Sequence, residues 1–182
     1  MTWKNTLARY GSLSITLHWL MVVLLIAVYT CTELRSHFDR GTAGRLLSGQ
    51  FHYMFGLTIF ALVWLRLLAR GLGVTPRITP APPRWQRRLA WLMHMALYAL
   101  MIAMPVLGWL TLSGEGKAIP FWGLQMPPLM APDKELAAQI EDWHIQIGEW
   151  GYWLIGLHTL AGLAHHYLKR DDTLSRMLPR RR

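Results

Sequence analysis

The most regular feature of the chain is the alternation of long apolar segments with shorter polar ones. Four apolar segments cover about residues 13–30, 50–69, 89–112 and 143–168. Each is close to the roughly 20 residues that an α-helix needs to cross the hydrocarbon core of a bilayer. The pattern therefore predicts an all-α integral membrane protein, in which a bundle of four transmembrane helices forms a single membrane domain over residues 1–182.

The first apolar segment could be mistaken for a signal peptide, because Lys4 and Arg9 precede it. It is long for that role, contains the polar His18 and is not followed by a small-x-small cleavage site. We therefore expect this segment to be retained as a membrane span.

The positions of the basic residues orient the predicted spans. Fourteen of the nineteen Lys and Arg residues lie in or next to the N-terminus, the 70–88 linker and the C-terminal tail, and five lie in the other two loops. Loops rich in Lys and Arg face the cytoplasm, so both termini are predicted to be cytoplasmic.

In a soluble protein the net charge of +9 would suggest a nucleic-acid partner. Beside membrane spans the same residues act as anchors, and we expect no nucleic-acid partner.

The connecting segments differ in character. The inner linker GLGVTPRITPAPPR is rich in proline and is predicted to be extended. The outer loop before the fourth span ends in DKELAAQIEDWH, which places Leu136, Ile140 and Trp143 at helical spacing. This spacing predicts a short helix leading into the fourth span, either at the membrane interface or in a solvated loop.

Histidines are the unusual residues of the apolar segments. Of the eight histidines His37 lies in a loop, and the other seven lie in or at the edge of a predicted span: His18, His52, His94, His144, His158, His165 and His166. A single histidine in a span is often a hydrogen-bonded structural residue. Ionisable side chains are nevertheless costly inside a bilayer and commonly mark a functional site there.

Five of these histidines fall into two sets at different depths. His52 and His144 stand at the outer starts of the second and fourth spans, so they lie at similar height near the outer face. His158 follows His144 by fourteen residues. On a helix this interval is about 21 Å and close to a whole number of turns, so the two side chains point to nearly the same side. His18 and His94 lie near the inner face, which gives one imidazole set at each face.

Two imidazoles from different helices suit a haem held from both sides, because histidine is a common axial ligand of haem iron and bundle cores commonly hold cofactors. A bare zinc site normally has four protein ligands, or three and an open position. The single cysteine, Cys31, excludes a CxxC motif. Small residues beside the histidines could admit a flat macrocycle, although they also serve helix packing: Gly56, Gly148, Gly151, Gly156 and Gly162.

Arginines near the inner set could pair with haem propionates. Arg66 follows His52 by fourteen residues and so lies at about the depth of the inner set, with Arg70 one turn later. The alternative is a snorkelling arginine that anchors its helix, and this interpretation is favoured for Arg70.

Short motifs around these histidines are more specific than the spans themselves. They are SITLHW in the first span, the start of the second span around His52, WH and GYWLIGLH in the fourth, then AHHY and the tail DDTLSRMLPRRR. On these residues the chain resembles, essentially from end to end, the bacterial cytochrome b561 family of di-haem membrane proteins. Within that family it looks most like the superoxide:ubiquinone oxidoreductases, or superoxide oxidases.

The resemblance implies two haem b groups in a multi-pass protein of the bacterial inner membrane. By position, His52 and His144 would bind the iron of the outer haem, and His18 and His158 that of the inner haem. The choice of His18 comes from the resemblance, because depth alone leaves His94 open in its place.

The resemblance also implies a ubiquinone site near the inner haem. There His165 or His166 could offer a hydrogen bond or a proton to a quinone oxygen. The alternative role for these two residues is to anchor the end of the helix at the membrane interface.

The leading hypothesis is therefore an oxidoreductase that oxidises superoxide at the periplasmic face and passes the electrons to ubiquinone. Basic residues of the outer loops could attract the anion: Arg35, Arg40, Arg45, Lys117 and Lys134. The second hypothesis is a cytochrome b subunit that exchanges electrons between the quinone pool and a periplasmic redox protein. A distant alternative is a histidine-based metal or proton transporter, although such spans usually show breaks or acidic partners near the midplane.

Overall fold

The fold is built from long helices. The computed structural model describes residues 3–178 and contains, within that range, four long helices: α1 (Ser12–His37), α2 (Ala43–Leu72), α3 (Arg84–Gly114) and α4 (Lys134–Tyr167). Between α3 and α4 lie two short antiparallel strands, β1 (Pro120–Phe121) and β2 (Leu124–Gln125), and a 3₁₀ turn, η1 (Ser175–Met177), follows α4. The chain is therefore all-helical apart from this small hairpin, as predicted.

Three of the long helices are candidate membrane spans by length and hydropathy: α1, α2 and α3. Each contains one of the first three predicted spans and extends beyond it at both ends. α4 contains most of the fourth predicted span, 143–168, but is not among these candidates.

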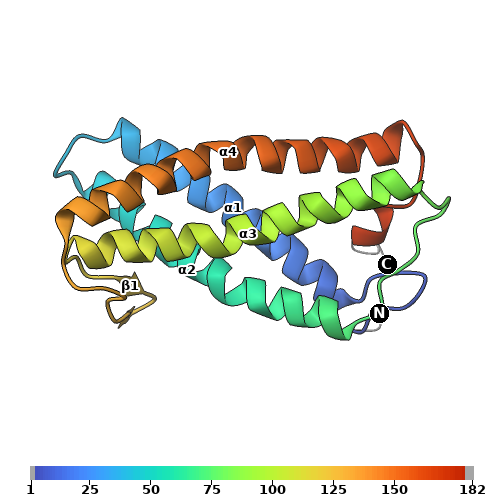
Figure 1. Cartoon of the computed structure of the whole chain (residues 1–182), viewed down its shortest axis with the longest axis horizontal. Coiled ribbons are helices and arrows are strands. Elements are labelled where there is room, and N and C mark those ends of the chain that lie inside the picture. The colour runs from blue at the N-terminus through green and yellow to red at the C-terminus, as the bar shows by residue number, and fades with distance from the viewer. Residues whose placement is uncertain (1–2, 179–182) are drawn as a thin grey trace.

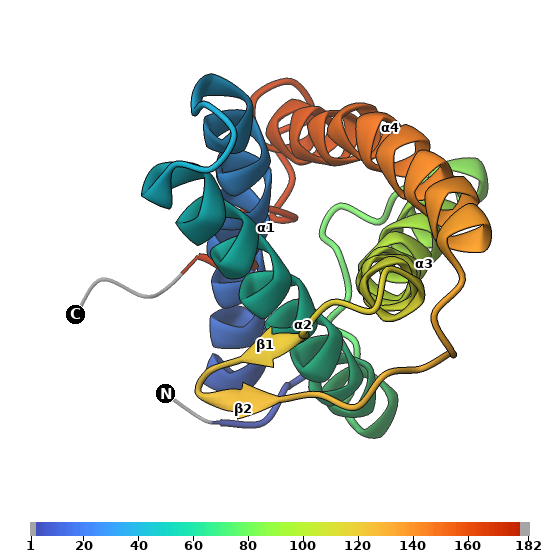
Figure 2. The ribbon, with the colours of Figure 1, turned by 90° about the vertical axis from the view of Figure 1, so that its left-hand side faces the viewer.

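The helices pack lengthwise in a defined order (Figures 1 and 2). α1 packs along α2, α2 along α3, and α3 along α4. Seen from one end, α1 and α2 lie on one side of the molecule and α3 and α4 on the other. A buried apolar cluster joins the first three helices through Met21 and Leu24, Ile59 and Val63, and Tyr98 and Met101.

Both described ends of the chain lie at the same end of the molecule (Figure 1). The segment after α4 folds back onto α1, because Trp19 Nε1 donates to the Met177 carbonyl at 2.6 Å and Arg9 donates to the Ser175 carbonyl at 3.2 Å. The segment after α4 is therefore held against the N-terminal part of the described chain.

The connections differ in part from the prediction. The inner linker 73–83 is without helix or strand, as predicted. The segment expected to form a separate short helix before the fourth span is instead the first part of α4. Asp133 caps this helix by accepting from the Leu136 N–H at 3.0 Å. No proline or glycine interrupts residues 134–147, so the helix continues without a break.

Gly151 of α4 faces Tyr29 of α1. A Cβ at position 151 would overlap the Tyr29 hydroxyl and lie 3.3 Å from Leu100 Cδ2. The tyrosine cannot turn away freely, because its hydroxyl donates to the Gly148 carbonyl at 2.9 Å. We expect Gly151→Ala to lower the free energy of unfolding by about 1–3 kcal/mol through overpacking. Thermal unfolding followed by circular dichroism in detergent measures this change.

Gly71→Ala is the matched control, since nothing lies within 4 Å of a Cβ added there. Alanine is the better helix former, so this variant should unfold at the wild-type temperature or slightly above it. Equal unfolding temperatures for the two variants would show that the contact between Gly151 and Tyr29 carries no packing constraint.

Candidate functional site

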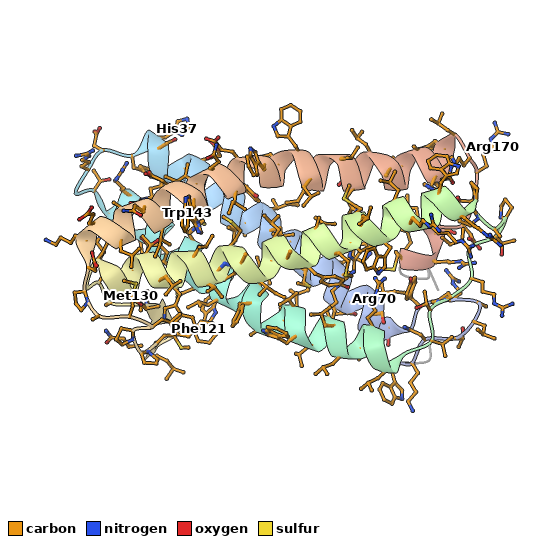
Figure 3. All side chains as sticks on the ribbon, in the orientation of Figure 1. His37, Arg70, Phe121, Met130, Trp143 and Arg170 are labelled. Carbon is orange, nitrogen blue, oxygen red and sulfur yellow. The ribbon has the colours of Figure 1, made fainter. Side chains whose placement is uncertain are left out.

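One pair of histidines lies at the end of the molecule that holds the α1–α2 loop. His52 of α2 and His144 of α4 face each other with ring centroids 6.0 Å apart and ring planes at 71°. Figure 3 labels Trp143 and His37 at this end, opposite Arg70 and Arg170 at the other. The structure thus brings together two residues that are distant in sequence and were predicted to share one depth.

The ring of His52 is oriented by α1. Its Nδ1 lies 3.2 Å from the Val28 carbonyl and 3.0 Å from the Thr32 hydroxyl. The hydroxyl of Thr32 donates to the same Val28 carbonyl, so it can accept from the histidine. This arrangement assigns the proton to Nδ1 and leaves Nε2 free, the usual state of a histidine that binds a metal through Nε2.

His144 packs against the backbone of α3. A Cβ at Gly108 would lie 3.2 Å from His144 Cε1, so the glycine provides clearance for the ring. Nδ1 of His144 is buried, and the backbone of Met104 on α3 acts on the ring without a hydrogen bond of good geometry at Nδ1.

The second histidine set lies toward the opposite end and contains three residues. The ring centroid of His158 on α4 lies 6.5 Å from that of His18 on α1 and 5.5 Å from that of His94 on α3. The Nδ1 of His94 is 2.5 Å from the Ala90 carbonyl of its own helix, which leaves its Nε2 free as well. The geometry therefore brings both His18 and His94 within reach of His158, with His94 the nearer of the two.

Arg66 lies beside this inner set. The guanidinium is close enough to act electrostatically on His18, His94 and His158. Its Nε donates to the Tyr98 hydroxyl at 3.3 Å, whereas its NH1 is buried and has no partner among residues 3–178. A buried guanidinium N–H without an acceptor is costly, and a carboxylate ligand would satisfy it. Arg70 is exposed instead and lies over the Tyr98 ring at 5.9 Å.

Both sets have the spacing that suits one metal ion held from two sides. Metal–nitrogen distances of about 2 Å, with each centroid about 1 Å behind its nitrogen, place two opposed rings about 6 Å apart. The distances of 6.0 Å for His52–His144 and 6.5 Å for His18–His158 match this value. Gly56 and Gly156 are half-buried, yet nothing lies within 4 Å of a Cβ added at either. These residues fit a haem at each set, with a histidine on each side of the iron.

Within residues 3–178, no group of three or more His, Cys, Asp or Glu side chains is arranged to hold a bare metal ion. The arrangements that the described residues offer to a metal are therefore the opposed histidine pairs with open space beside them.

The last two histidines have different surroundings. His165 Nδ1 lies 2.5 Å from Asp171 Oδ2, and the Asp171 side chain is only 4% exposed. Burial raises the pKa of Asp171, but hydrogen bonds from Thr173 and His165 outweigh it and hold that pKa below its usual value. His166 instead packs its ring against Tyr167 at 4.8 Å. Of the two, only His165 is held in a fixed orientation by a carboxylate.

The basic residues predicted to attract an anion are spread over the outer loops. Arg35 is half-buried and acts electrostatically on His52, so it is near the outer pair. Arg45 is tied to the carbonyls of Arg35 and Phe38, and Lys117 pairs with Glu115 at 2.8 Å. Arg40, within the loop between α1 and α2, and Lys134, the first residue of α4, are both exposed.

Some residues of these sites were missed by the sequence analysis. Thr32, Tyr98 and Gly108 contact the candidate residues from other helices, so nothing in their local sequence identifies them. Asp171 begins the tail DDTLSRMLPRRR, which the sequence analysis noted, but its contact with His165 could not be read from that motif.

Comparisons with known proteins agree over nearly the whole chain. A family model described as prokaryotic cytochrome b561 matches residues 9–180. The chain is 37% identical over 174 residues to "Cytochrome b561 homolog 1" of Escherichia coli strain K12, covering 96% of this chain and 99% of that protein. It is 34% identical to "Probable superoxide oxidase CybB" of Yersinia pestis, with coverage of 96% and 98%. "Cytochrome b561 homolog 2" of Escherichia coli strain K12 is 27% identical, with coverage of 98% and 95%.

Proposed function

The chain belongs to the prokaryotic cytochrome b561 family, a family of haem b proteins that transfer electrons in membranes, and from this premise we propose that it oxidises superoxide and reduces ubiquinone. One relative is named a probable superoxide oxidase. The proposal includes two haem b groups per chain, one at each histidine set.

The observation that supports two haems is the presence of two opposed histidine pairs. His52–His144 and His18–His158 have nearly the same ring separation, and α4 contributes one member to each pair. On α4, His144 and His158 are fourteen residues apart. This interval corresponds to about 21 Å along the helix, which is most of a bilayer core of about 30 Å. Bound haem b supplies reversible one-electron transfer at each position.

We further propose a topology of four membrane-spanning helices in one domain, with α4 as the fourth span. Both described chain ends lie at one end of the molecule, and the basic linker 70–88 lies between α2 and α3 at that same end. The positive-inside rule makes this end cytoplasmic in the bacterial inner membrane. His52 and His144 then face the periplasm.

The chain's own residues have distinct roles in this proposal. His52 and His144 would hold the outer haem, with Thr32 fixing the ring of His52. His18 and His158 would hold the inner haem, and the NH1 of Arg66, without a partner among the described residues, would be available to a propionate. The basic residues of the outer loops attract superoxide. His165, whose Nδ1 is held by Asp171, is the candidate to provide a hydrogen bond or proton to ubiquinone from Nε2 when its imidazole carries both protons.

The overall reaction balances in electrons and protons. Two superoxide anions each lose one electron and become O₂. One ubiquinone gains these two electrons and takes two protons from the cytoplasmic side to become ubiquinol. A haem iron with two histidine ligands has no open coordination position. This coordination suits electron transfer rather than oxygen binding.

Rapid mixing tests the proposed donor. We expect superoxide to reduce the oxidised, detergent-purified protein quickly and the rate constant to fall as salt is added, because screening weakens the attraction of an anion to basic loops. Stopped-flow absorbance of the haem bands measures both effects.

A cytochrome of similar exposure without basic outer loops is the reference for this measurement. Haem reduction no faster than in that cytochrome, and insensitive to salt, would overturn the superoxide role. If ubiquinol also reduced the haems, and a periplasmic redox protein co-purified, the second hypothesis of a quinone-linked cytochrome subunit would replace it.

A further inference from the structure

The segment 118–132, between α3 and α4, carries no charged residue. It reads AIPFWGLQMPPLMAP, with Gln125 as its single side-chain amide, and it contains both strands of the hairpin, β1 and β2. The outer loop between α1 and α2, by contrast, contains Asp39 and Arg40. Connections that face water are normally polar, so the composition of 118–132 is unusual for a solvated loop.

The hairpin lies along the side of α2 rather than beyond its end. β1 packs against α2, and the buried Ile119 belongs to a cluster with Leu57 of that helix. Figure 2 shows the two strands on the outer side of α2, away from α4. The ring of Trp122 lies 5.7 Å from that of Phe55, and its Nε1 donates to the Thr58 hydroxyl at 2.9 Å.

The contact with Thr58 gives the depth of the hairpin. Thr58 follows His52 by six residues, which corresponds to about 9 Å along the helix, and it lies well inside the predicted span 50–69. α2 is itself a candidate membrane span by length and hydropathy. Where α2 crosses the bilayer, the Trp122 ring therefore lies at the depth of the hydrocarbon core.

The segment pairs backbone groups within the protein, as a membrane environment requires. β1 and β2 pair with each other. Trp109 Nε1 donates to the Pro127 carbonyl at 2.9 Å, and the Leu129 N–H donates to the Ser113 hydroxyl at 3.0 Å. Four of the fifteen residues are prolines, which have no N–H to satisfy. Non-helical backbone is tolerated at membrane depth where the protein satisfies it in this way.

Large apolar side chains of the segment remain exposed. Trp122 is 52% exposed, Leu124 68% and Leu129 48%. Trp122 has a φ of 45°, which is uncommon for a bulky residue, and the contacts of its ring with α2 offset this strain. The exposed face continues that of α2, where Leu65 lies two turns beyond Thr58 and is 53% exposed. Tryptophan is also enriched at the membrane interface.

We propose that residues 118–132 insert into the outer half of the bilayer, where Trp122, Leu124 and Leu129 contact lipid acyl chains. Acyl chains cover an uncharged apolar face without requiring hydrogen bonds, and this face is continuous with the lipid-facing side of a membrane span. The proposal rests on α2 and α3 crossing the bilayer and is independent of the redox reaction.

Spin labels on single cysteines measure this contact in the full-length holoprotein in phosphatidylcholine liposomes. Cys31→Ser removes the one native thiol, and Leu124→Cys or Leu129→Cys then carries the label at an exposed position. The readout is the ratio of collisions with O₂ to collisions with a polar nickel chelate, measured by power saturation in electron paramagnetic resonance. The haem irons affect both measurements at one site alike.

Arg40→Cys in the α1–α2 loop and Leu65→Cys on α2 are the matched controls for water and for lipid. We expect the ratio at Leu124 to exceed that at Arg40 at least about fivefold and to approach that at Leu65, because hydrocarbon dissolves O₂ and excludes a polar complex. The ratio at Leu129 should be intermediate, because its N–H bonds to Ser113 near the outer end of α3. Haem content should match the wild type in every variant.

A ratio at Leu124 equal to that at Arg40 would place the hairpin in water and overturn the proposal. Few collisions with either reagent would mean that protein covers the label, and a protein interface would then replace the lipid contact. A low ratio at Leu65 would overturn the membrane span of α2 and the lipid contact with it. Superoxide and ubiquinone enter none of these measurements, so the proposed function stands or falls separately.

Discussion

Replacing His52 or His144 with alanine will leave one haem per chain in place of the two that the proposed function assigns to the wild type. The rings lie 6.0 Å apart on α2 and α4, and alanine at either position leaves the iron without one of its two protein ligands. The reduced α-band should lose one spectral component, and superoxide should no longer reduce the protein quickly. Haem extraction with pyridine, together with reduced-minus-oxidised spectra, measures the loss.

His37→Ala is the control for this first result. His37 lies at the same end of the molecule, but its Nδ1 contacts the Glu33 carbonyl at 2.8 Å and its ring faces no other histidine in the described part of the chain. It should keep two haems. Two haems in the His52 and His144 variants would exclude this pair as ligands.

Replacing His18 or His158 with alanine will remove the other haem and stop electron transfer to ubiquinone. The outer component of the spectrum should remain and should still be reduced by superoxide, because the outer pair is intact. The two half-reactions are measured separately on each variant. Reduction by superoxide should depend on the outer pair, and electron transfer to ubiquinone should depend on the inner pair. A variant of this pair that loses the outer component instead would contradict the proposed order of the two haems.

His94→Ala decides which residue faces His158 across the iron. His94 is nearer to His158 than His18 is, at 5.5 Å against 6.5 Å between centroids, and only the family resemblance favours His18. We expect His94→Ala to keep both haems with at most a shifted spectrum. If His94→Ala loses the inner haem while His18→Ala retains it, His94 is the ligand and the assignment of His18 is wrong.

The sequence by itself predicted the four helical segments and the similar height of His52 and His144 along them. Apolar length fixes where a helix can lie in a membrane, and a rise of about 1.5 Å per residue converts sequence intervals into height. The similar height of His52 and His144 follows from such intervals, and the structure places their ring centroids 6.0 Å apart. The helical spacing of Leu136 and Ile140 was also sufficient to predict helix in that segment, although not that it continues into α4.

Only the tertiary structure decided what surrounds each candidate residue. Depth does not fix how neighbouring helices are rotated, so the clearance that Gly108 gives His144 could not be read from the sequence. The same holds for the hydrogen bond from Arg66 to Tyr98, which joins residues on different helices. The turn that joins Asp171 to His165 and buries Arg176 forms because residues at the start of α1 hold it in place. Such contacts depend on packing between segments distant in sequence, which a periodic pattern along one helix does not encode.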